Sequence, residues 1–269
     1  MSCSKIPQIV LKSSSNQSNM PLIAFGTAAV TNNDGEITKA AVVEAIKSGY
    51  RHFDTASIYG SEEALGEAIQ QALQLGLIQS REITPDPEIR IFGSLFDPLA
   101  RVWIAMEECQ KLGLTKSIGV SNFTCKKLED LLSFATILPS VNQVEMNPVW
   151  HQKKLKEYCE AKGIIITAFS PLGAKGTMWG SNEVIDSEIL KQIAEEHGKT
   201  VAQVCLRWLY EQGVSMAVKS YNKDRMKQNL EIFDWSLTRD DHEKIDKIKQ
   251  IRVNNGPFAF IPDIWDGET

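Results

Sequence analysis

The chain has 269 residues, of which 43% are apolar and 23% charged. This composition is typical of a globular protein and argues against a disordered chain or a membrane protein. The formal net charge of -5 gives the chain no overall basic character, so we expect neither a nucleic acid nor a membrane as partner.

The cysteines and the N-terminal segment favour a reducing compartment. Five cysteines are scattered along the chain and none forms a C-x-x-C pair, so neither a disulfide framework nor a zinc site is predicted. The four histidines show no metal-ligand spacing, and no metal is expected. Because the first residues lack the apolar core of a secretory signal, we expect a cytoplasmic protein.

In chain order, short runs rich in β-branched and aromatic residues alternate with longer amphipathic stretches. Such alternation is typical of βαβ units and a parallel sheet. The predicted strands are 21–26, 51–55, 117–121, 141–146, 164–170 and 214–220. The predicted helices are 37–49, 61–76, 99–113, 126–135, 152–163, 187–198 and 200–213, and most of them end in Gly.

The segment 80–98 interrupts this alternation. It lies between the strand at 51–55 and the strand at 117–121, carries three prolines, and offers only one short strand, EIRIFG at 88–93. The sequence therefore predicts six strands, or seven if EIRIFG is counted.

Two architectures fit this order: an incomplete (β/α)8 TIM-type barrel and an open doubly wound sheet. A dinucleotide-binding open sheet would carry G-x-G-x-x-G at the start of its first helix, and this motif is absent. In a barrel, polar strand ends face one mouth, where such folds place their sites. The polar residues at predicted strand ends are Asp54, Ser121, Asn122, Gln143, Glu145, Ser170, Lys219 and Ser220. We therefore expect a single incomplete barrel domain over residues 1–269.

The last predicted strand leads into a candidate phosphate site. Lys219 and Ser220 end the strand, Asn222 follows, and Arg225 lies at the start of a helix. Together these side chains can grip a phosphate monoester through charge-assisted hydrogen bonds. Barrels commonly bind phosphate near their last two strands. From this feature alone, a lyase or isomerase of phosphorylated sugars also fits.

Five stretches of the sequence closely resemble the signature stretches of the aldo-keto reductases. They are GYRHFDTASIYGSEEALGEAI at 49–69, SIGVSNF at 117–123, VNQVEMNP at 141–148, ITAFSPLG at 166–173 and VKSYNKDRMKQN at 218–229. The wording is most like the plant subgroup that includes chalcone (polyketide), codeinone and methylecgonone reductases. The resemblance implies an NADPH-dependent oxidoreductase that reduces a ketone or aldehyde of plant specialised metabolism.

By this resemblance, Tyr59 is the proton donor and Asp54 is the carboxylate beside it. A phenol has an ordinary pKa near 10, so it donates a proton efficiently only if a nearby cation lowers that pKa. In the family a lysine supplies the cation, and a histidine completes the catalytic set.

The resemblance also implies a cofactor site. Ser121, Asn122 and Gln143 would hydrogen-bond the nicotinamide carboxamide, although Ser121 and Asn122 also fit ordinary turns after strands. The cofactor set is Gly26, Thr27, Asp54, Ser121, Asn122, Gln143, Phe169, Ser170, Leu172, Lys219, Ser220, Asn222, Arg225, Gln228 and Asn229. Trp150 would line the substrate mouth.

The chain departs from the family where the lysine and the histidine are expected. Neither family stretch is present, as though a βαβ unit had been removed around residues 82–98. Arg81 and Arg90 are the nearest cations in sequence that could replace the lysine. We expect impaired activity, and the alternatives are a non-catalytic NADPH-binding relative or a splice or gene-model variant. Relatives are expected to be monomers, whereas an open barrel would favour self-association.

Overall fold

The computed structural model describes residues 6–11, 18–28, 35–79, 99–177, 179–252 and 266, together with the backbone of 89–92. Arg81, the Arg90 side chain and most of the expected deletion at 82–98 lie outside the described residues. The replacement of the family's lysine by Arg81 or Arg90 therefore stays a prediction.

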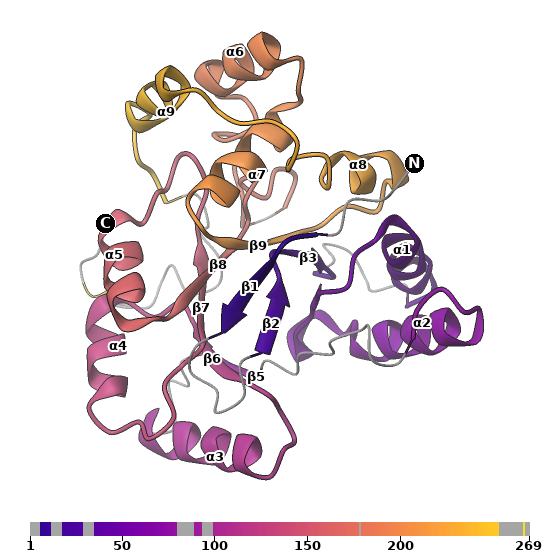
Figure 1. Ribbon diagram of the computed structural model, residues 1–269, viewed down its shortest axis with the longest axis vertical. Coiled ribbons are helices and arrows are strands. Elements are labelled where there is room, and N and C mark those ends of the chain that lie inside the picture. The colour runs from indigo at the N-terminus through magenta and orange to yellow at the C-terminus, as the bar shows by residue number, and fades with distance from the viewer. Residues whose placement is uncertain are drawn as a thin grey trace.

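A curved parallel sheet forms the centre of the fold (Figure 1). Its strands are β3 (Ile23–Gly26), β4 (Phe53–Asp54), β5 (Ile89–Phe92), β6 (Ile118–Ser121), β7 (Val141–Glu145), β8 (Ile165–Phe169) and β9 (Ser215–Val218). The seven strands run in the order β4-β3-β9-β8-β7-β6-β5, and every neighbouring pair is parallel. All six predicted strands are confirmed, and EIRIFG supplies the seventh.

Helices surround the outside of the sheet (Figure 1). They are α1 (Gly35–Ser48), α2 (Glu62–Gln74), α3 (Leu99–Lys111), α4 (Cys125–Leu132), α5 (Lys153–Lys162), α6 (Glu188–His197), α7 (Val201–Glu211), α8 (Lys223–Gln228) and α9 (Arg239–Asp246). Side-chain caps fix several of their starts: Thr124 accepts from the Lys127 N–H, and Thr200 forms a capping box with Gln203. Helices such as α3, α5 and α7 pack against neighbouring strands, whereas α9 packs against α6.

The main core lies between the outer face of the sheet and these helices. Phe25, Val120 and Val144 are buried there with helix residues such as Ile46 and Trp103. Burial of such side chains contributes about 1.5 to 3 kcal/mol each, which makes this layer the main source of stability.

An N-terminal hairpin that the sequence did not predict lies across the amino-terminal ends of β7 and β8. It consists of β1 (Gln8–Leu11) and β2 (Ser18–Pro21), paired antiparallel. Leu11 and Met20 are fully buried against Val141 and Ile165, at the starts of β7 and β8. The carboxyl ends of the strands lie at the opposite end, so a site must be sought there.

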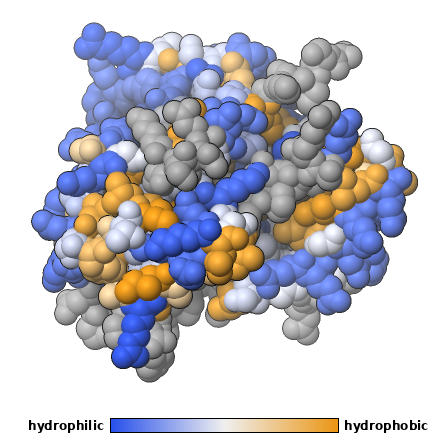
Figure 2. Space-filling model, turned by 60° about the horizontal axis from the view of Figure 1, so that its bottom comes forward, coloured by the Kyte–Doolittle hydropathy of each residue, from blue (hydrophilic) through white to orange (hydrophobic). Residues whose placement is uncertain are grey.

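The sheet has two open edges in the described part of the chain. No pairing joins β4 to β5, the two end strands, so the described strands form an incomplete barrel. Apolar side chains are exposed on the helices beside these edges, including Leu75 after α2 (58%), Ile104 in α3 (61%) and Leu112 after α3 (65%). Figure 2 shows hydrophobic patches among hydrophilic residues on the face that carries α3.

Candidate active site

Asp54 and Tyr59 lie where β4 gives way to a tight turn. Asp54 is the last residue of β4, and Tyr59 ends a short 3-10 turn, Ser57–Tyr59. The Tyr59 N–H donates to the Ala56 carbonyl at 2.8 Å, and Gly60 ends the turn at φ 60°. Both side chains are partly exposed, so a ligand at this end of the sheet can reach them.

Three hydroxyls fix this turn to the neighbouring strand. Thr27 Oγ1 donates to the Asp54 carbonyl at 2.9 Å and lies 2.7 Å from Ser61 Oγ, which lies 2.8 Å from Thr55 Oγ1. Because the Thr27 proton goes to Asp54, Ser61 must donate to Thr27 and Thr55 to Ser61. Thr27 and Ser61 are fully buried. The hydroxyl of Thr27 is therefore used inside the fold, and its expected contact with the cofactor stays a prediction.

Ser61 is a positioning residue that the sequence reasoning missed. A serine before Glu62 has the signature of a helix N-cap, but its side chain does not cap α2. Its hydroxyl instead joins Thr27 and Thr55. The local sequence gives a signal for a cap, but not for this longer-range contact.

Gln143 contacts Asp54 directly, although the two residues are 89 positions apart. Gln143 Nε2 donates to Asp54 Oδ1 at 3.1 Å, and the Gln143 side chain is buried. The sequence reasoning assigned Gln143 to the nicotinamide and not to this carboxylate. The fold thus joins the predicted catalytic and cofactor groups in one cluster.

Ser121 and Asn122 complete this cluster at the carboxyl end of β6. Ser121 Oγ donates to the Gln143 carbonyl at 2.9 Å, as does the Asn122 N–H at 2.9 Å. Asn122 has φ 61°, a left-handed conformation that Asn tolerates better than most residues. Its Oδ1 is buried and has no hydrogen-bond partner in the described part of the chain. A buried acceptor needs a donor, and a carboxamide NH2 group supplies one, so these residues fit a nicotinamide.

The turn after β8 brings backbone close to the same end of the sheet. Phe169 is the last residue of β8 and is partly exposed, and Ser170 has φ 47°. Gly173 has φ 74°, and a Cβ there would lie 2.8 Å from Val184 Cγ2. Glycine is therefore required at this position. Leu172 is partly exposed and packs against the main core.

Residues of the predicted phosphate grip contact one another at the carboxyl end of β9. Arg225 Nε donates to Ser220 Oγ at 3.4 Å, the Asn222 N–H donates to Ser220 Oγ at 3.2 Å, and the Arg225 N–H donates to Asn222 Oδ1 at 2.9 Å. The Lys219 ammonium lies 4.8 Å from the centre of the Tyr221 ring, and partial burial lowers the pKa of Lys219. Ser220, Asn222 and Arg225 are thus brought together, and their binding of a phosphate stays a prediction.

The neighbouring predicted residues lie on both sides of this grip. Gly26, at the end of β3, faces Lys219: a Cβ there would be 3.5 Å from Lys219 Cβ. Gln228 is exposed, whereas Asn229 is buried. The nearby Tyr50 hydroxyl donates to the Met226 carbonyl at 3.1 Å, and burial of that phenol raises the pKa of Tyr50. The expected contact of Asn229 with adenine stays a prediction.

Trp150 lies in the loop after β7, as expected for a residue near the strand ends. Its ring is largely buried, its Nε1 has no hydrogen-bond partner among the described residues, and the Arg252 guanidinium lies 4.7 Å from the ring centre. Its role toward a substrate stays a prediction.

The described residues contain no group of three or more His, Cys, Asp or Glu side chains placed to hold a metal ion. None of their helices is long and apolar enough to cross a membrane.

Comparisons with known proteins agree with the fold and show the family. The model of the Aldo/keto reductase family matches residues 22–83 and 79–250. The chain is 47% identical to an NAD(P)H-dependent 6'-deoxychalcone synthase of Glycine max over 311 residues, covering 98% of each chain. It is 44% identical to the NADPH-dependent codeinone reductase 1-4 of Papaver somniferum over 321 residues, covering 99% of each.

A solved structure shows the same similarity. The crystal structure of a Bombyx mori aldo-keto reductase in complex with NADP superposes with a TM-score of 0.83 and 28% identity, covering 97% of this chain and 99% of that one.

The alignments also show a difference in length. The alignment with the poppy protein runs over 321 residues, although this chain has only 269. The two segments matched by the family model overlap at residues 79–83, close to the start of the segment 80–98. The relative therefore contains residues that this chain lacks.

Proposed function

Because the chain belongs to the aldo-keto reductase family, we propose that it binds NADPH at the carboxyl end of its sheet and has a shortened form of the family's carbonyl-reducing site. One observation carries the proposal: Asp54 and Gln143, 89 positions apart, lie in hydrogen-bond contact between the turn that carries Tyr59 and the Ser121–Asn122 pair. Predicted acid and cofactor groups are thus adjacent.

Each part of the site has a distinct task in this proposal. Ser121, Asn122 and Gln143 hold the carboxamide, and Ser220, Asn222 and Arg225 hold the 2'-phosphate. The bound NADPH would supply the hydride. The Tyr59 hydroxyl donates its proton to the substrate oxygen, on which negative charge develops, and Asp54 orients the groups around that phenol. The substrate is a ketone or aldehyde of plant specialised metabolism, with Trp150 beside it.

Turnover in this chain is expected to be slow. The family's lysine and histidine belong, by resemblance, to the stretch that follows the Tyr59 helix, where the relative has additional residues. Without that lysine, the phenol of Tyr59 lacks the cation that the family uses to lower its pKa, so we expect slower proton donation. The length difference therefore also favours a second candidate function, in which the chain binds NADPH but does not catalyse a reaction. A splice or gene-model variant would have this property.

Two further points concern an alternative reaction class and the location of the protein in the cell. The phosphate grip alone also fits a sugar-phosphate lyase or isomerase, but the family match over both segments favours a dinucleotide. We also propose a cytoplasmic location, which the scattered cysteines support.

The test measures oxidation of NADPH that depends on a carbonyl substrate. We expect a slow reaction with an aldehyde that Tyr59→Phe reduces by at least about 100-fold, since general acids contribute factors of this size. Ile58→Ala, at the exposed residue before Tyr59, is the control and should leave the rate unchanged. No carbonyl-dependent oxidation by the unmodified chain would favour the non-catalytic candidate, and a rate unaffected by Tyr59→Phe would refute the role of that phenol.

A further inference from the structure

The polar groups of β6 and β7 form hydrogen bonds whose direction is fixed. Ser121 Oγ donates its single proton to the Gln143 carbonyl oxygen at 2.9 Å. The Ser121 oxygen can therefore only accept from Asn122, so the Asn122 amide must turn its Nδ2 toward Ser121, at 3.3 Å. Asn122 Oδ1 is left facing away, and within the described ranges it has no hydrogen-bond partner.

Asp54 fixes the second amide of the cluster. An ionised carboxylate only accepts hydrogen bonds, so Gln143 must turn its Nε2 toward Asp54, at 3.1 Å. The Gln143 oxygen Oε1 then lies on the other side of the amide. Both amides of the cluster therefore present a carbonyl oxygen and keep their NH2 groups engaged within the protein.

We infer that Asp54 is a positioning residue that makes this cluster selective for a donor, the NH2 group of a pyridine carboxamide. The inference rests on the proposed function, because it takes a nicotinamide dinucleotide as the ligand. Two acceptor oxygens match the two N–H donors of a primary amide, whereas a methyl ketone at the same position offers no donor. A buried acceptor left without a donor weakens binding.

The first experiment compares two dinucleotides on two proteins. NADP+ and its 3-acetylpyridine analogue, in which methyl replaces the NH2 group, are titrated calorimetrically into the full chain and into Asp54→Asn. The unmodified chain should prefer NADP+ by about tenfold, which corresponds to one or two hydrogen bonds. In Asp54→Asn, the new amide can donate as well as accept, so Gln143 is free to turn, and the preference should fall at least about threefold.

The ratio of the two affinities isolates the effect of orientation. The loss of the Asp54 charge affects the binding of both dinucleotides, which carry the same charged groups, and it therefore cancels in the ratio. Asp130→Asn, which makes the same charge change at an exposed residue of α4, should keep the full preference. Equal preferences in the unmodified chain and in Asp54→Asn would overturn the inference.

A second measurement needs no cofactor. The side-chain NH2 protons of Gln143, observed by NMR in the unliganded protein, should exchange slowly with water and should shift and exchange faster in Asp54→Asn. Gln143→Ala identifies the signal. If neither dinucleotide binds but this signal depends on Asp54, the proposed function fails and the orienting contact stands. If the signal is unchanged in Asp54→Asn, the inference fails whatever the dinucleotides do.

Discussion

Under the proposed function, Arg225 is the residue on which the distinction between NADPH and NADH depends. Its guanidinium reaches Ser220 Oγ, and its backbone N–H is held by Asn222, so the planar donor group is oriented before any ligand arrives. Such preorganisation reduces the entropy lost when a phosphate binds.

Replacing this arginine should therefore change cofactor choice. In Arg225→Gln we expect the affinity for NADP+ to fall roughly ten- to a hundredfold, as for a lost charged hydrogen bond, and the affinity for NAD+ to stay within about twofold. Titration of both dinucleotides measures this. Lys227→Gln, the same loss of charge at an exposed position of α8, is the control. An equal loss for both dinucleotides would contradict the assignment.

For individual residues, the sequence predicts which side chains belong to the candidate site better than it predicts which of them contact one another. Asp54 and Gln143 could be picked out as polar residues at strand ends, and Arg225 as a basic residue at the start of the helix that follows Lys219 and Ser220. The hydrogen bond between Gln143 and Asp54 could not be predicted, because it depends on the order of the strands around the sheet. The hydroxyl chain through Ser61 was missed for the same reason.

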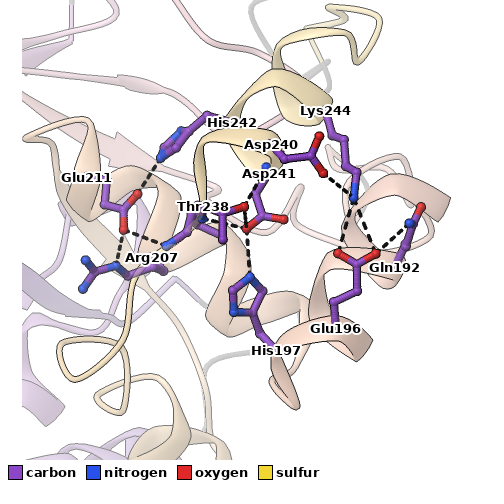
Figure 3. A network of polar contacts seen from close by, with 11 residues as sticks. Gln192, Glu196, His197, Arg207, Glu211, Thr238, Asp240, Asp241, His242 and Lys244 are labelled. Carbon is purple, nitrogen blue, oxygen red and sulfur yellow. Dashed lines mark hydrogen bonds and ion pairs between the residues drawn. The ribbon is translucent and has the colours of Figure 1, made fainter.

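Helix α9 illustrates how an element is held in place by polar contacts and not by a large apolar face. Figure 3 shows its contacts with α6 and α7. His242 Nε2 lies 2.6 Å from Glu211 Oε2, His197 Nε2 lies 2.8 Å from Asp241 Oδ2, and Lys244 Nζ lies 3.3 Å from Glu196 Oε2. These contacts secure the last helix before the C-terminal segment.

The ionisation of Asp241 should make this attachment sensitive to acid. Burial of Asp241 opposes ionisation, but hydrogen bonds from the Thr238 hydroxyl and N–H, and then from His197, outweigh it and lower the pKa of Asp241. A carboxyl whose pKa is lowered by folding stabilises the fold above its ordinary pKa of about 3.9, and this contribution is lost as the pH falls.

Urea unfolding measured from neutral pH to about pH 3 tests this prediction, because the contribution of Asp241 to stability should be lost below about pH 5. We expect the free energy of unfolding to fall less steeply with acid in Asp241→Asn than in the unmodified chain. Asp240→Asn, at the exposed neighbouring carboxylate, should keep the steep fall. If the free energy of unfolding fell equally steeply with acid in all three proteins, Asp241 would not contribute to the acid sensitivity.

The strands and most of the helices of the barrel were predicted, but helix α9 and the hairpin of β1 and β2 were not. Strands such as Val141–Glu145 follow from their apolar, β-branched runs, and helices such as Glu188–His197 from their periodicity and terminal Gly198. The hairpin of β1 and β2 was missed because one arm, Ser18–Pro21, has a polar, proline-ended sequence with no alternation. Its stability comes from Leu11 and Met20, which pack against strands far along the chain.

The whole molecule is a parallel barrel fold left open between β4 and β5 in its described part. The parallel order could be predicted from the alternation of strands and helices, and the seventh strand from EIRIFG. The exposed side chains of Ile104 and Leu112 lie in and just after α3, the helix that packs beside the edge strand β5. Open edges of this kind favour self-association, as the sequence suggested.

Restoring the additional residues of a relative should restore catalysis. In a chimera that replaces residues 80–98 with the corresponding stretch of the poppy reductase, we expect carbonyl-dependent NADPH oxidation to rise at least about 100-fold, because a cation would then act on Tyr59. The affinity for NADP+ should change by less than about threefold, since its proposed binding residues lie elsewhere. A folded chimera that binds NADP+ without faster oxidation would contradict this explanation.

The central claim is that this open fold still has a site for a phosphorylated nicotinamide dinucleotide. The most direct test is calorimetric titration of NADP+ into the full unmodified chain, with NAD+ titrated in parallel. The account predicts saturable binding of one NADP+ per chain, at least about tenfold tighter than that of NAD+. Absence of NADP+ binding to the folded chain, or equal affinities for the two dinucleotides, would contradict it.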